Sequence, residues 1–75
     1  MKINWNGNFS IKTEVDINSK DEKSIFIIAN KDGLLSLANI LTDMANDEIY
    51  SGWHLHLDDS VGLEKGSVEL TLAKK

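Results

Sequence analysis

The sequence of 75 residues contains no cysteine, no proline and no arginine, and these absences exclude several classes of protein. Without cysteine, the chain forms neither a disulfide framework nor a thiolate metal site. Eight lysines face twelve acidic residues, which gives a net charge of −4. Because phosphate recognition needs a basic face, this charge argues against nucleic acid as a partner.

Long apolar runs are also missing from the sequence. No stretch approaches the ~20 apolar residues that span a bilayer, and residues 1–7 lack the apolar core of a signal peptide. We therefore expect a cytoplasmic protein with no membrane partner. The length fits a single domain over residues 1–75. A domain of this size has little apolar surface to spare for a substrate pocket of the usual ~300–1,000 Å³.

Polar and apolar residues are patterned as in β-strands in four segments. Residues 9–17 alternate with a period of two, and residues 24–29 form a β-branched and aromatic run, which together predict a hairpin. Residues 50–58 and 67–73 alternate in the same way, and the glycine-containing stretch 59–66 between them is typical of a loop.

The period changes between these pairs of strands and predicts a helix over residues 31–46, with Asn30 or Asp32 as its cap. We expect its apolar stripe to face the core, widened by Leu35 and Ile40. The stripe consists of Leu34, Leu37, Ala38, Leu41, Met44 and Ala45.

The resulting order, β-β-α-β-β, predicts an α+β fold of two layers. A four-stranded sheet with one helix packed on one face is the simplest arrangement that buries every apolar stripe. A β-grasp-like strand order, 2-1-4-3, fits the chain order. The order 1-2-3-4 with a right-handed crossover is the alternative.

His54 and His56 form the sharpest chemical feature of the sequence. Two residues apart on a strand, they point the same way at roughly 6.6 Å. If Asp58 opposes Ser67 in the neighbouring strand, His56 opposes Glu69 and the apolar faces agree. Two interpretations remain open: a cross-strand ion pair on a solvated face, or a zinc site made by the two histidines with Glu69.

No pattern in the sequence predicts an enzyme or a bound cofactor. There is no nucleophile elbow and no phosphate-binding glycine loop. Asp58 and Asp59 alternate faces on a strand, so they do not converge on one substrate, and paired acids of this kind are typical of a turn.

Acidic residues gather in the second half of the chain, which favours a basic protein partner through electrostatic steering. Of the aromatic residues that could anchor an interface, Trp53 shares a phase with Leu55 and is expected in the core, while Trp5 has no assigned core phase. The acidic residues are Asp43, Asp47, Glu48, Asp58, Asp59, Glu64 and Glu69, against Lys65, Lys74 and Lys75.

The segment 52–70 resembles the Immunity protein 32 family, small bacterial proteins expected to neutralise a polymorphic toxin encoded next to them. The resemblance covers about residues 32–75, including a less specific Leu/Ala helix, and nothing in residues 1–29 matches. It implies a cytoplasmic binding protein with a toxin domain as its partner. The matching positions are His54, His56, Asp58, Gly62, Leu63, Glu64, Gly66, Ser67 and Glu69.

Two functional hypotheses follow from these observations. In the first, the chain binds a cognate toxin through the polar sheet face and the 58–66 loop, with Trp5 as an added anchor; the predicted contacts are His54, His56, Asp58, Asp59, Glu64, Glu69 and Trp5. In the second, it is a self-associating module, because residues 25–28 are apolar on both faces of their strand and one helix covers only one. A homodimer is compatible with toxin binding.

Overall fold

The computed structural model describes residues 2–16 and 24–75 and contains one helix and four strands in that part of the chain. The order β-β-α-β-β is confirmed, while the predicted turn at 18–23 and Ile17 lie outside the described residues. The bounds are β1 (Ile11–Asp16), β2 (Ser24–Ala29), α1 (Lys31–Met44), β3 (His54–Leu57) and β4 (Leu70–Ala73).

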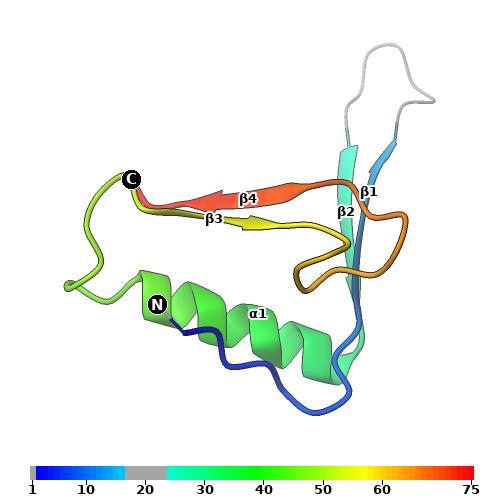
Figure 1. The fold of residues 1–75 in the computed structure, drawn as a ribbon, viewed down its shortest axis with the longest axis horizontal. Helices are drawn as coiled ribbons and strands as arrows, with labels where there is room; N and C mark the ends of the chain where they lie inside the picture. Colours follow the sequence, from blue (N-terminus) through cyan, green and yellow to red (C-terminus); the bar gives the residue numbers. More distant parts are fainter. Residues whose placement is uncertain (1, 17–23) are drawn as a thin grey trace.

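The strands form two separate antiparallel sheets, β1–β2 and β3–β4, so the prediction of a single four-stranded sheet is wrong. Both predicted strand orders, which assumed a single sheet, are therefore wrong as well, whereas the α+β class is confirmed. Figure 1 shows α1 running alongside β3 and β4, while the β1–β2 hairpin crosses the end of that layer.

The junction between the sheets explains why no continuous ladder forms. The main-chain amides of Glu64 and Val68 donate to β1, at the carbonyls of Ile11 (2.8 Å) and Thr13 (3.2 Å). Between these bonds, side chains replace the ladder: the Thr13 amide donates to the Ser67 hydroxyl at 3.2 Å, and the Thr13 hydroxyl donates to the Val68 carbonyl. The segment 64–68 therefore ties the two sheets together without becoming a strand of either one.

The core lies where α1, the two sheets and the loop after β3 meet. Its buried members are Ile11, Ile40, Met44, Leu57 and Leu63. The predicted inward face of β3 is confirmed, because Leu57 is fully buried and Trp53 and Leu55 pack against this core. Leu70 and Leu72 of β4 pack there too.

The buried face of α1 matches the predicted stripe only in part: Ile40 and Met44 are buried and Leu37 packs on the core, as predicted. Leu34, Leu35 and Leu41 are exposed, and the helix turns Gly33 and Ser36 inward instead, next to Ile40. A Cβ built at Gly33 would overlap the Ser10 carbonyl oxygen. Small residues therefore select this face because they let the helix approach β1 closely, and that contact displaces the leucines to the surface.

Asn30 caps α1 and also connects it to the N-terminal segment. Its side-chain oxygen accepts from the amides of Gly33 (2.7 Å) and Ser10 (2.9 Å), and its side-chain nitrogen donates to the Asn8 carbonyl at 2.8 Å. Of the two predicted caps, the structure selects Asn30. Asp32 instead accepts from the Asn8 amide at 3.1 Å.

Candidate functional site

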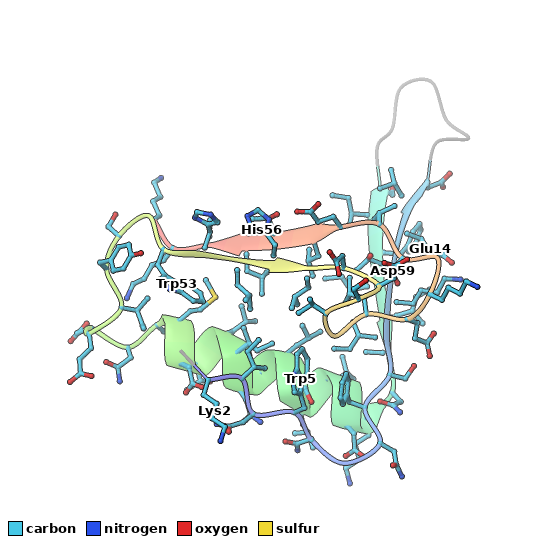
Figure 2. All side chains as sticks on the ribbon, viewed as in Figure 1. Lys2, Trp5, Glu14, Trp53, His56 and Asp59 are labelled. Carbon is cyan, nitrogen blue, oxygen red and sulfur yellow. The ribbon has the colours of Figure 1, made fainter. Side chains whose placement is uncertain are left out.

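The outer face of the β3–β4 sheet carries a cluster of exposed polar side chains, which Figure 2 shows around His56, away from α1. The rings of His54 and His56 stand edge to face with centroids 4.9 Å apart. His56 Nδ1 lies 2.7 Å from Glu69 Oε1 and 2.9 Å from Thr71 Oγ1. The strand spacing therefore places both imidazoles on one face, as predicted, with a carboxylate beside them.

The register of this sheet is shifted by two residues from the predicted one. His56 faces Thr71 rather than Glu69, and Leu57 faces Leu70 rather than Val68. A shift of two keeps every side chain on its predicted face, and Glu69 reaches His56 diagonally. The predicted ion pair between His56 and Glu69 is confirmed. Thr71, which the predicted register sets opposite His54, lies opposite His56 instead.

The two histidines with Glu69 do not complete a metal site in this geometry. Nowhere in residues 2–16 and 24–75 are three or more His, Cys, Asp or Glu side chains grouped so as to hold a metal ion. His56 Nδ1 is already engaged by Glu69, and His54 Nδ1 lies 3.2 Å from the Gly52 carbonyl oxygen.

The loop after β3 is held by its own hydrogen bonds. The Asp58 carbonyl accepts from the amides of Val61 and Leu63, each at 3.0 Å, and the Asp58 carboxylate accepts from the Ser60 amide at 2.8 Å. Leu63 is buried in the core. This pattern is a turn opened by an aspartate, as the paired acids predicted, and it leaves Asp59 exposed at the tip.

Trp5 supports this loop from inside the molecule. Its ring stacks on Phe9 with centroids 4.6 Å apart and lies against Gly62, whose φ is 85°. Trp5 is half-buried and packs on the core, so it shapes the loop from beneath. Glu64, at the far end of the loop, is exposed and accepts a hydrogen bond from the Ser10 hydroxyl.

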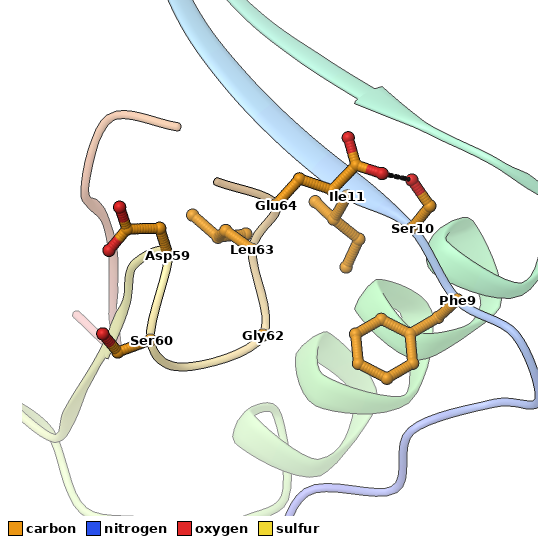
Figure 3. A pocket seen from close by; sticks show the side chains of 8 residues that line it. All are labelled: Phe9, Ser10, Ile11, Asp59, Ser60, Gly62, Leu63 and Glu64. Carbon is orange, nitrogen blue, oxygen red and sulfur yellow. Dashed lines mark hydrogen bonds between the residues drawn. The ribbon is translucent and has the colours of Figure 1, made fainter. Parts of the chain in front are cut away.

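The predicted site residues therefore fall into three groups. His54, His56 and Glu69 are in contact on the sheet face; Asp58, Asp59 and Glu64 are spaced along the loop; Trp5 lies beneath it. A shallow hollow of about 210 Å³ opens beside the loop (Figure 3), which is smaller than the ~300–1,000 Å³ of ordinary ligand sites. It is lined by Phe9, Ser10, Ile11, Asp59, Ser60, Gly62, Leu63 and Glu64.

Comparison with known families adds the deciding observation. A family model for Immunity protein 32 matches residues 24–75, from the first residue of β2 onward. The chain belongs to the Immunity protein 32 family. The resemblance stated from residues 32–75 is confirmed, and the match also takes in β2, which had shown nothing recognisable. Immunity protein 32 implies a cognate toxin as the general kind of partner.

The other two comparisons add no relative to this family assignment. No curated protein and no solved structure matches the chain. Within the described residues, this Immunity protein 32 member has no helix with the length and apolar character needed to cross a bilayer.

Proposed function

We propose that this chain is a cytoplasmic immunity protein that neutralises a cognate bacterial toxin by binding it directly, without catalysing a reaction. The family match supports an immunity role. The observation that carries direct binding is the exposed loop 58–66, which is fixed from within by Leu63 and Trp5. A loop already held in one conformation loses less entropy on binding a partner.

The proposed contact surface joins this loop to the outer face of the β3–β4 sheet. The exposed side chains of His54, His56 and Glu69 cover the sheet face, and Asp59 and Glu64 extend the surface along the loop. Since none of these five side chains lies in the core, changing them alters the surface without opening a cavity.

Charge favours a toxin with a basic surface. The chain carries a net charge of −4, and acidic groups on a binding surface raise the rate of association with a basic partner by ~10–10³. Binding should therefore weaken as salt is added, because exposed charges are screened beyond about 10 Å at 0.1 M ionic strength.

The decisive experiment is a growth-rescue assay in bacteria. The open reading frame encoded beside this gene is expressed as the toxin, with or without this protein. Rescue together with a one-to-one complex in titration calorimetry is the expected result. If the neighbour kills and this protein gives neither rescue nor a complex, the proposed partner is wrong.

A double variant, His54→Ala with Glu69→Ala, tests the proposed surface in the same assay. We expect weaker binding and reduced rescue. Glu48→Gln is the matched control, because Glu48 is an exposed acid outside the loop and the sheet face. Unchanged affinity in the double variant would place the contact elsewhere on the molecule.

Self-association is a second function that the structure favours. Residues 25–28 are all exposed and apolar, although one face of their strand was expected to be covered. We propose a homodimer that forms alongside toxin binding.

A further inference from the structure

β2 forms an open edge of the β1–β2 sheet. This sheet has two strands, and the far edge of β1 is occupied by the segment 64–68 through the bond from the Glu64 amide to the Ile11 carbonyl. Along β2, by contrast, no third segment is hydrogen-bonded within the described ranges 2–16 and 24–75. An unpaired strand edge is a ready template for a strand from another chain.

The main-chain groups of Ile25 and Ile27 point to this open edge. The Asn30 amide donates to the Ser10 carbonyl at 3.1 Å, which makes these two residues a hydrogen-bonded pair of the antiparallel ladder. Bonded pairs recur at every second residue, so the even-numbered residues of β2 bond to β1. The odd-numbered residues direct their N–H and C=O groups outward.

The side chains of β2 are apolar and exposed on both faces of the sheet. Ile25 is 71% exposed, and Ile27 lies with it on the face that carries Val15. Phe26 and Ile28 are about half exposed on the opposite face. β2 contains no charged residue, although soluble proteins usually protect an edge strand with charge, proline or a bulge.

We propose that a second copy of this chain covers this edge, with the two β2 strands antiparallel and related by a two-fold axis at Phe26. In this register Ile25 of one copy bonds to Ile27 of the other, and each copy satisfies the outward groups of both residues. Phe26 then faces Phe26 of the second copy at a non-hydrogen-bonded position, where side chains approach most closely. This interface deepens the self-association proposed above and does not depend on toxin binding.

The direction of the free main-chain groups of β2 restricts the other registers in which two β2 strands could pair. A register that pairs an odd with an even residue would leave the outward groups unmatched, because only odd residues present them. A register centred on Ile27 would bring Ala29 into the ladder, at the point where the chain leaves β2 for the first turn of α1, because the next residue, Asn30, is the helix cap. The register centred on Phe26 avoids that turn.

The composition of the edge favours a second copy as the occupant. Residues 25–28 are all exposed and apolar, and pairing the two β2 strands would satisfy their outward main-chain groups and join two two-stranded sheets into one of four strands. A two-fold axis pairs this uncharged strand with an identical uncharged strand. The toxin surface proposed above is built from β3, β4 and the loop, so both can be occupied together.

Single-cysteine crosslinking tests this register directly, since the chain has no cysteine of its own. In Phe26→Cys the two thiols would stand on the axis, with Cα atoms about 4.5 Å apart, which a disulfide can span. In Ile28→Cys, on the same face of the same strand, the two positions would be about 13 Å apart. We expect oxidation to link the first variant into a dimer and to leave the second unlinked.

Sedimentation equilibrium of the unmodified chain, with Ile25→Lys as a variant, completes the test. The unmodified protein should shift to twice the monomer mass as concentration rises, while Ile25→Lys stays monomeric with the circular dichroism of the parent. A monomer at every concentration would overturn the proposal, and equal crosslinking of both cysteine variants would overturn the register. If the parent is monomeric and Ile25→Lys loses growth rescue, the edge belongs to the toxin instead.

Discussion

Gly62 lies against the indole ring of Trp5, so closely that a Cβ built at position 62 would overlap Cη2 and stand 2.9 Å from Cζ2. Gly62 also has a φ of 85°, a conformation that other residues adopt only at a cost. The pair links the N-terminal segment to the loop proposed to bind toxin.

Gly62→Ala should destabilise the protein through both effects. The left-handed conformation costs an alanine about 1–2 kcal/mol, and the overlap with Trp5 adds about 1–3 kcal/mol of overpacking. Gly66→Ala is the matched control, because its φ is 88° and nothing lies within 4 Å of its built Cβ. The difference between the two variants in the free energy of unfolding, measured in urea, gives the effect of the Trp5 contact. Equal losses of stability would show that the contact contributes nothing.

Gly33→Ala should lower stability although it lies within a helix. At an exposed helical site, replacing glycine with alanine stabilises by roughly 0.5–1 kcal/mol. Here the new methyl would overlap the backbone carbonyl oxygen of Ser10, so the sign should reverse to a loss of about 1–3 kcal/mol. A thermal melt that rises in Gly33→Ala would contradict the close approach of α1 to β1.

Ile40→Ala and Leu41→Ala should differ sharply although the residues are neighbours on α1. Ile40 is fully buried, so its truncation should cost about 2–5 kcal/mol. Leu41 is 53% exposed, and its truncation should cost under about 1 kcal/mol, as at surface sites. Denaturant midpoints of the two variants check which face of the helix is packed, and similar losses would restore the stripe predicted from periodicity.

Glu69→Gln should leave stability almost unchanged. The side chains of His56 and Glu69 are 55% and 57% exposed, and exposed ion pairs contribute under about 1 kcal/mol. The same variant should weaken toxin binding in calorimetry if the sheet face is the contact surface. A large loss of stability would mean that the pair supports the fold, and the binding data would then need a different variant.

Local patterns in the sequence predicted most of the secondary structure. The bounds of β2 are those read from its β-branched run, and α1 begins at the predicted residue, because each depends on neighbours in the chain. The prediction of the sheet arrangement failed because it depends on a long-range junction. There the Ser67 hydroxyl accepts from the Thr13 amide and the Thr13 hydroxyl donates to the Val68 carbonyl, where a main-chain ladder was expected.

The candidate site was predictable to the extent that it depends on strand alternation. Alternation placed His54 and His56 on one face, and it placed Glu69, which lies directly before β4, on that same face. The packing of Trp5 beneath the loop was not predicted, because its contact with Gly62 joins residues far apart in sequence and no periodic pattern indicates such a contact. The helix face was predicted wrongly at Leu34, Leu35 and Leu41, because apolar periodicity carries no information about the close approach that Gly33 permits.

The core extends beyond the part of the chain that matches the family. The match begins at Ser24, yet Ile11 is fully buried in the core and Trp5 and Phe9 pack against it. An expression fragment cut at Ser24 would therefore have an open core and should not fold alone. Because residues 2–16 fill that gap from one side, a synthetic peptide of this segment, added in trans, should restore the fold by fragment complementation.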